Sequence, residues 1–149
     1  MKKIYFLCSG KSNRAQIAEG FARIYFKGEF EWISTSYPDE KPLLKSTINI
    51  MNEIGIDISG YKSPAFNANF FKEADYIISI CENSILDMSI IPTNAEVHHI
   101  QIEEPLQYDD YFLQIKSYRQ VRDRLGVIIK ELSLKLDSTV DIDLQDIIL

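Results

Sequence analysis

Cys8 and Arg14 are the residues of this chain whose types and spacing most strongly indicate chemistry. The cysteine ends an apolar run at residues 4–7 that is typical of a buried strand, and the arginine follows six residues later. The arginine opens a segment with helical spacing, whose apolar side chains share one face: Ile17, Phe21, Ile24 and Tyr25. A strand, a loop of small and polar residues and a helix N-terminus together form a site at which backbone N–H groups bind an anion.

The predicted anion-binding loop consists of Ser9, Gly10, Lys11, Ser12, Asn13 and Arg14. A thiolate is the nucleophilic form of cysteine, and we expect the helix N-terminus, Lys11 and Arg14 to lower the pKa of Cys8. The planar guanidinium of Arg14 matches two oxygens of a tetrahedral anion, and the loop amides are expected to hold the others. The predicted ligand is a phosphoryl group, arsenate or a close analogue. The alternative interpretation is a buried structural cysteine beside a solvated arginine.

The composition is typical of one soluble domain, at 149 residues. A net charge of −6 argues against nonspecific binding to nucleic acid, and no apolar run is long enough to span a membrane. Two cysteines far apart in the sequence are typical of a protein of the reducing cytoplasm. No cluster of metal ligands is visible, so we expect neither a metal nor another cofactor, and we interpret His98 and His99 as structural.

Strand and helix patterns alternate along the chain. Apolar runs and alternation predict strands at residues 4–8, 30–34, 75–81 and 96–101. Helical spacing and stop signals predict helices at residues 14–27, 44–54, 69–74, 84–88 and 108–136, the third capped by Asn69. This order predicts a single doubly wound α/β domain, with a four-stranded parallel sheet flanked by helices. We assign residues 1–136 to this domain and residues 137–149 to a C-terminal tail.

Two further residues are expected beside the loop, because ligands of such sheets bind beyond the carboxyl ends of the strands. Glu104 follows the fourth strand and is the best candidate for the acid that protonates a leaving group, although a solvated acidic loop explains it equally well. Pro105 holds the backbone of Glu104 extended. Cys81 ends the third strand and is either a small buried core residue or a second thiol that forms a disulfide with Cys8.

Taken together, these motifs resemble the low-molecular-weight protein tyrosine phosphatases and, more closely, the thioredoxin-coupled arsenate reductases that share their fold. The resemblance covers roughly residues 2–135. It rests on the spacing of Cys8 and Arg14, residues 16–20, residues 56–59, the strand ending in Cys81, the Glu104–Pro105 step and residues 119–123. The resemblance implies that Cys8 is the nucleophile, Arg14 the oxyanion clamp, Glu104 the proton donor and Cys81 the first resolving cysteine.

Four positions depart from the family pattern. Glu104 stands where the family usually has an aspartate, and Met88 stands about where the reductases have a second resolving cysteine. Lys11 replaces an asparagine that braces the loop, and Ala15 replaces a hydroxyl residue that bonds the thiolate. Without the second resolving cysteine, either the predicted disulfide is reduced directly, or a small thiol assists, or reduction is not the function.

Three functions are therefore open from the sequence. The leading one is an arsenate reductase-like oxidoreductase, with arsenate as substrate and thioredoxin or a small thiol as reductant. The second is a phosphatase that acts on a phosphorylated substrate through a phosphocysteine, which water resolves. The third is a non-catalytic module that binds phosphate or another oxyanion, suggested by the changes at Lys11, Ala15 and Glu104.

Overall fold

The apolar run at the start of the chain forms β1 (Lys2–Cys8), an inner strand of a parallel sheet. The side chains of residues 4–7 are fully buried, as expected for a strand that is covered on both faces. On one side β1 pairs in parallel with β2 (Phe30–Ser36), and on the other with β3 (Tyr76–Cys81). Cys8 at the end of β1 is thereby placed between Ser36 and Ile80.

The structure is a computed structural model that describes residues 1–81, 91–92 and 94–139. In addition to the three strands above, it contains β4 (Glu96–Gln101) and four helices: α1 (Arg14–Tyr25), α2 (Lys45–Asn52), α3 (Ala68–Glu73) and α4 (Tyr111–Leu136). The predicted helix at residues 84–88 and the last ten residues of the predicted tail lie outside the described residues.

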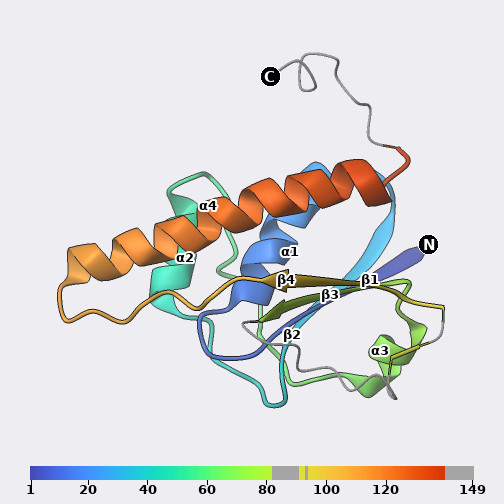
Figure 1. The fold of residues 1–149 in the computed structure, drawn as a ribbon, viewed down its shortest axis with the longest axis horizontal. Helices are drawn as coiled ribbons and strands as arrows, with labels where there is room; N and C mark the ends of the chain where they lie inside the picture. The colour runs from blue at the N-terminus through green and yellow to red at the C-terminus, as the bar shows by residue number, and fades with distance from the viewer. Residues whose placement is uncertain (82–90, 93, 140–149) are drawn as a thin grey trace.

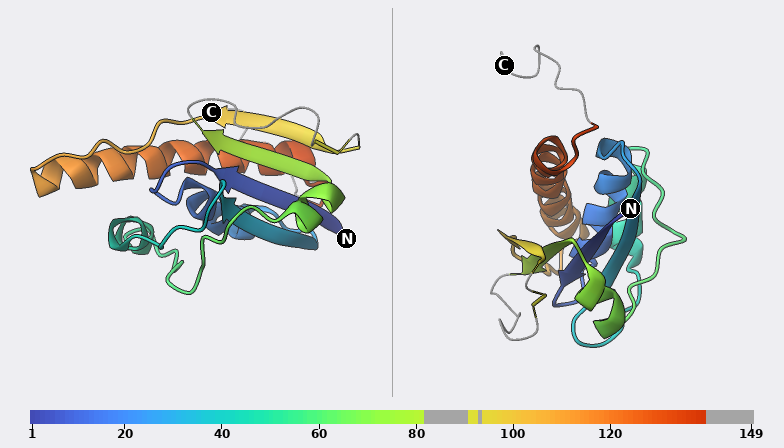
Figure 2. Two further views of the ribbon diagram at one scale, coloured as in Figure 1. Left: turned by 90° about the horizontal axis from the view of Figure 1, so that it is seen from below. Right: turned by 90° about the vertical axis from the view of Figure 1, so that its right-hand side faces the viewer.

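The four strands lie in the order β2-β1-β3-β4, and all neighbours are parallel. Helices α1 and α4 cover one face of the sheet and α3 lies against the other, as Figures 1 and 2 show. The larger core lies under α1 and α4 and includes Ile17, Phe21 and Leu125, whereas the smaller core packs Phe71 of α3 against Tyr5. The prediction of a single α/β domain with a four-stranded parallel sheet is confirmed.

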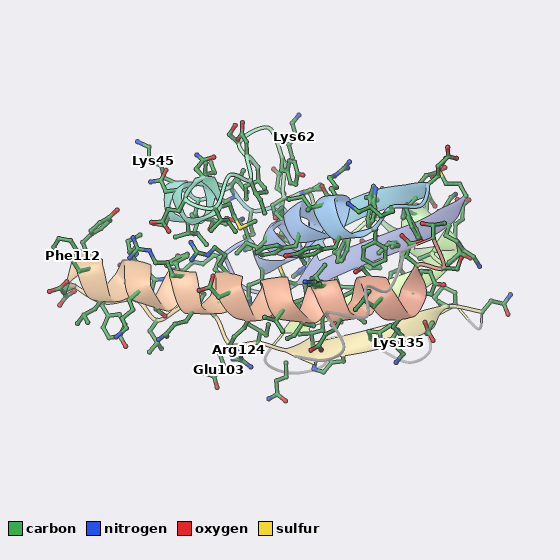
Figure 3. The ribbon with its side chains drawn as sticks, turned by 90° about the horizontal axis from the view of Figure 1, so that it is seen from above. Lys45, Lys62, Glu103, Phe112, Arg124 and Lys135 are labelled. Carbon is green, nitrogen blue, oxygen red and sulfur yellow. The ribbon has the colours of Figure 1, made fainter. Side chains whose placement is uncertain are left out.

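Helix α4 is longer than the sheet that it covers. Its 26 residues span about 39 Å, whereas strands of six or seven residues span roughly 20–23 Å. In Figures 1 and 2 the start of α4 extends beyond the carboxyl ends of the strands. This overhang ends in exposed side chains, of which Phe112 is 81% exposed at the tip seen in Figure 3.

Two predicted boundaries at the start of the chain were wrong. Helix α1 ends at Tyr25 instead of residue 27, because Phe26 turns extended and buries its ring in the core. Ile24 is 46% exposed, so it lies off the buried face of α1. Strand β2 continues to Ser36 instead of residue 34, because Thr35 and Ser36 are buried in the ladder despite their polarity. The Thr35 hydroxyl donates to Tyr5 Oη, which satisfies it without solvent.

The remaining helix limits shift for local reasons. Asn67 caps α3, because its side chain accepts a hydrogen bond from the Phe70 N–H, so the prediction of Asn69 as the cap was wrong. Helix α2 is shorter than residues 44–54, and Gly55 follows it in the left-handed region at φ 80°. Helix α4 begins at Tyr111, since Asp110 caps it. The predicted fourth strand at residues 96–101 is confirmed.

Asp137, which directly follows α4, is 4% exposed and connects the end of α4 to the segment that follows α1. Its carboxylate accepts hydrogen bonds from the N–H groups of Lys27 (2.6 Å) and Gly28 (3.0 Å), just after α1. Burial opposes ionisation of Asp137. The bonds from Gly28, Thr139 and Lys27 outweigh this effect and lower its pKa to about 2. The ionised form is therefore the one that the fold stabilises.

We expect Asp137→Asn to lower the free energy of unfolding by about 1–2 kcal/mol at pH 7, a figure reduced for partial screening by solvent. The folded-state pKa lies below the ordinary value of 3.8, so the stabilisation is present above that value and is lost as the pH falls toward 2. Urea denaturation at pH 7 and pH 3 measures this difference. The exposed Asp39→Asn is the control, and an equal loss at both pH values contradicts the assignment.

Candidate active site

The loop between β1 and α1 changes direction through two residues in the left-handed backbone region. Gly10 has φ 79° and Asn13 has φ 61°. Glycine adopts this conformation freely, and asparagine tolerates it better than other side chains do. Asn13 is followed directly by α1, so the positive end of the helix faces the loop.

Cys8 lies at the base of this loop, with 1% of its surface exposed. Its Sγ accepts a hydrogen bond from the backbone N–H of Ala15 at 3.3 Å. A donor aimed at sulfur stabilises the thiolate over the thiol. Its carbonyl oxygen accepts from the Tyr37 N–H at 2.9 Å, which fixes the end of the strand. The backbone of Ala15 thus supplies a bond to sulfur although its side chain carries no hydroxyl.

Arg14 carries its charge into the protein, since only 1% of its side chain is exposed. Nη1 donates to the carbonyl of Ile102, and Nη2 donates to the carbonyl of Ser9 at 2.6 Å. These bonds hold the guanidinium between the loop and the end of β4. Its Nε atom and the hydroxyl of Ser12 are buried without a hydrogen-bond partner in the part of the chain that the structure describes. Buried polar groups normally have partners, so both atoms are suited to a ligand.

The carboxylate of Glu104 occupies the loop. Its Oε1 accepts hydrogen bonds from the backbone N–H groups of Lys11 at 2.6 Å and Ser12 at 2.9 Å, and lies 3.9 Å from Arg14 Nη2. The carboxylate is so close to Gly10 that a Cβ atom there would overlap it. Two inward N–H groups and a cation therefore converge on one anionic oxygen, which is the arrangement expected of an oxyanion site.

Loop 103–110 is tied to α4, and this sets where Glu104 lies. The Leu106 N–H donates to Ser117 Oγ at 2.7 Å, and the side-chain amide of Gln107 approaches Tyr118 Oη at 3.4 Å. Pro105 is buried. A pocket of about 450 Å³ lies between this loop and α4, with Glu104, Ser117, Val121 and Arg124 among its lining residues.

Cys81 is brought to the same edge of the sheet by the strand register. Cys8 is paired with Ile80, so Cys81 is one residue further along the neighbouring strand. With strands about 4.8 Å apart and a rise of about 3.3 Å per residue, the two Cα atoms are roughly 6 Å apart. This backbone separation is within the limit of about 7 Å for a disulfide.

Most of the residues predicted for the site are thus close together. Cys8, residues 9–14 and Glu104 form one cluster, and the backbone of Cys81 adjoins it. Lys11 contributes its backbone N–H, while its side chain is exposed. Asn13 turns its side chain away from the oxyanion cradle, defined as the Lys11 and Ser12 N–H groups together with the Arg14 guanidinium.

Among the described residues, no group of three His, Cys, Asp or Glu side chains could hold a metal ion. No helix there is long and apolar enough to cross a membrane.

The sequence did not reveal the hydrogen bonds that hold the loop on the side away from the cradle. The side chain of Asn13 donates to the carbonyl of Pro42 (3.0 Å) and accepts from the N–H of Leu44 (2.8 Å). Thr47 Oγ1 donates to the carbonyl of Ser12 at 3.1 Å. The carbonyl of Ile102 was also missed, because a backbone acceptor leaves no trace in the residue types. Asparagine at the turn into a helix was the one available signal.

Comparison with known proteins agrees with this geometry. Residues 3–142 match the family described as low molecular weight phosphotyrosine protein phosphatase. The chain belongs to this family.

Named relatives of this phosphatase-family chain include arsenate reductases. One from Shouchella clausii is 30% identical over 131 residues, covering 87% of this chain and 94% of the relative. Another, from Halalkalibacterium halodurans, is 31% identical over 130 residues, covering 87% and 93%.

Solved structures show the same relationship. The structure described as an arsenate reductase in the phosphate binding state superposes with a TM-score of 0.73 at 29% identity, covering 92% of this chain and all of that one. A low molecular weight protein tyrosine phosphatase from T. tengcongensis has the same TM-score at 21% identity, covering 91% of this chain and all of that one, which shows the shared fold.

We predict that Asn13→Ala destabilises this phosphatase-family fold by about 2 kcal/mol, because it removes two hydrogen bonds and strains the left-handed backbone. Asn13→Gly removes the same bonds but relieves the strain, so it should be about 1 kcal/mol less destabilising than Asn13→Ala. Urea denaturation of the three proteins measures both effects. Equal stability of the two variants would show that the backbone at residue 13 is not constrained.

Proposed function

We propose that this protein is a thiol-dependent arsenate reductase in which Cys8, Arg14, Glu104 and Cys81 carry the reaction. One observation supports this above the others: the Lys11 and Ser12 N–H groups and the Arg14 cation meet at one anionic oxygen, beside the loop that begins at Cys8. The names of the relatives and the phosphate-bound structural neighbour agree with an arsenate- or phosphate-sized ligand.

In the first step, the thiolate of Cys8 attacks arsenic. A sulfur–arsenic bond forms and an arsenic–oxygen bond breaks. Glu104 acts as a carboxylic acid and gives its proton to the departing oxygen, which leaves as water. The loop amides and Arg14 hold the remaining oxygens, and the unpartnered Nε of Arg14 and hydroxyl of Ser12 supply further donors.

In the second step, the thiolate of Cys81 attacks the sulfur of Cys8. A disulfide forms and the sulfur–arsenic bond breaks, with its electron pair remaining on arsenic. Arsenic thereby gains two electrons and leaves as arsenite, and the two cysteines lose two. The register places the backbone of Cys81 diagonally across from Cys8, which supports this role. Because successive residues of a strand face opposite sides of the sheet, the attack requires the end of β3 to turn toward Cys8.

The disulfide must then be reduced by an external thiol. We propose thioredoxin or a small thiol as that reductant, and the cytoplasm as the compartment, because both cysteines must be kept reduced between turnovers. Met88 stands about where a second resolving cysteine is expected from the resemblance, so direct attack by the reductant on the Cys8–Cys81 disulfide is the proposed route.

The second candidate function is that of a phosphatase. The family match favours it, because the same Cys8 attack on a phosphoryl group gives a phosphocysteine that water resolves without Cys81. Glu104 then protonates the leaving oxygen of a phosphorylated substrate.

Paired assays of wild type, Cys8→Ser and Cys81→Ser separate these functions. We expect dithiol-dependent arsenite production to be lost in both variants, because reduction needs both sulfurs. Hydrolysis of p-nitrophenyl phosphate should be lost in Cys8→Ser alone. If the wild type produces no arsenite and Cys81→Ser still hydrolyses p-nitrophenyl phosphate, the results support the phosphatase function. Phosphate binding without any turnover supports a non-catalytic module.

Arg14→Lys is predicted to weaken inorganic phosphate binding by about 100-fold, since a point charge cannot donate both in the cradle and to the Ile102 and Ser9 carbonyls. Isothermal titration calorimetry measures the affinity. The exposed Arg23→Lys, in the last turn of α1, serves as the matched control and should bind phosphate as the wild type does. Unchanged binding in Arg14→Lys contradicts the assigned role of the guanidinium.

A further inference from the structure

We propose that Glu104 is an internal ligand of the oxyanion cradle, which an incoming oxyanion must displace, and that this makes it a determinant of anion specificity. The inference rests on the proposed function, since it concerns the same site. It adds that the cradle is closed by the protein's own carboxylate until a ligand of higher charge replaces it.

The contacts of Glu104 are those of a bound anion. One carboxylate oxygen takes both the Lys11 and Ser12 N–H groups, at 2.6 and 2.9 Å, and the carboxyl group packs on the Cα of Gly10. A tetrahedral oxyanion bound to the same two N–H groups would overlap it. Glu104 therefore cannot remain in this position while the proposed substrate is bound.

The length of the side chain makes this contact possible. Pro105 is buried and Leu106 is bonded to Ser117, so the backbone of Glu104 is held from its C-terminal side. From a fixed backbone, an aspartate is one methylene shorter and its carboxylate falls short of the two N–H groups. The glutamate carboxylate therefore reaches the two N–H groups, whereas an aspartate carboxylate at the same position would stop short of them.

A pocket beside loop 103–110 can accommodate the displaced side chain of Glu104. Glu104 also lines the pocket of about 450 Å³ against α4, and Arg124 contributes a cationic side chain to the same lining. Figure 3 shows Arg124 beside the start of the loop, close to Glu103. A move into this pocket takes the carboxylate off the cradle and leaves it within reach of solvent and of a bound ligand.

An internal ligand selects among external ones by charge. The tethered carboxylate is present at high effective concentration and competes with every anion that enters. A monoanion gains little over the carboxylate that it replaces, whereas a dianion such as phosphate or arsenate interacts more strongly with Arg14 and the loop amides. We therefore expect the site to bind nitrate or acetate very weakly and to bind dianionic oxyanions, which can displace the Glu104 carboxylate.

The test compares Glu104→Asp and Glu104→Ala with wild type, using inorganic phosphate and nitrate in calorimetry and the alkylation rate of Cys8 by neutral iodoacetamide. Both variants should bind phosphate about tenfold more tightly, bind nitrate measurably, and alkylate about tenfold faster. Glu104→Asp is the diagnostic variant, because it keeps the negative charge and removes only the reach. Glu103→Asp is the control and should match wild type.

Phosphate affinity and alkylation rate that are unchanged in Glu104→Asp overturn the internal-ligand proposal while leaving the proposed function intact. Tighter binding in Glu104→Ala alone also overturns it, since loss of a nearby charge then explains the result. Failure of all the proteins to bind phosphate overturns the oxyanion site itself, and with it both proposals.

Discussion

The buried guanidinium of Arg14 is the constraint around which the site is built. A cation removed from water must have anionic or carbonyl partners, and this one is held by the carbonyls of Ile102 and Ser9. Those two carbonyls come from parts of the chain that are far apart in sequence, one just after β4 and one just after β1. By binding both, the guanidinium fixes the loop to the strand that delivers Glu104.

The groups that hold the Glu104 carboxylate are the same ones that we propose hold an external anion. Backbone N–H groups recognise negative oxygen without regard to what carries it, so a carboxylate and an arsenate or phosphate compete for one set of donors. Cys8 is almost fully buried at the base of this loop, where β1 is paired on both sides. The parallel register brings the backbone of Cys81 to the same edge of the sheet as Cys8, because β1 and β3 end side by side.

Much of the fold and the outline of the site could be read from residue types. The buried strand before Cys8, the spacing to Arg14 and the long final helix carry strong apolar patterns. The missed features are those that residue types do not encode. Thr35 and Ser36 look like a loop but are buried by pairing with β1, and the carbonyl of Ile102 is indistinguishable from any other. The position of Glu104 depends on loop geometry that only the folded chain defines.

The strand order has a consequence for how the chain acquires this fold. Lys2 pairs with Phe30, but Ile4 also pairs with Tyr76, so the inner strand β1 is completed by a partner some seventy residues away. Closing such a long segment costs chain entropy before any contact compensates for it. The pairing of β1 with β3 is available only after β3 has been synthesised. Slow folding is thus expected of this topology, whatever chemistry its loop performs.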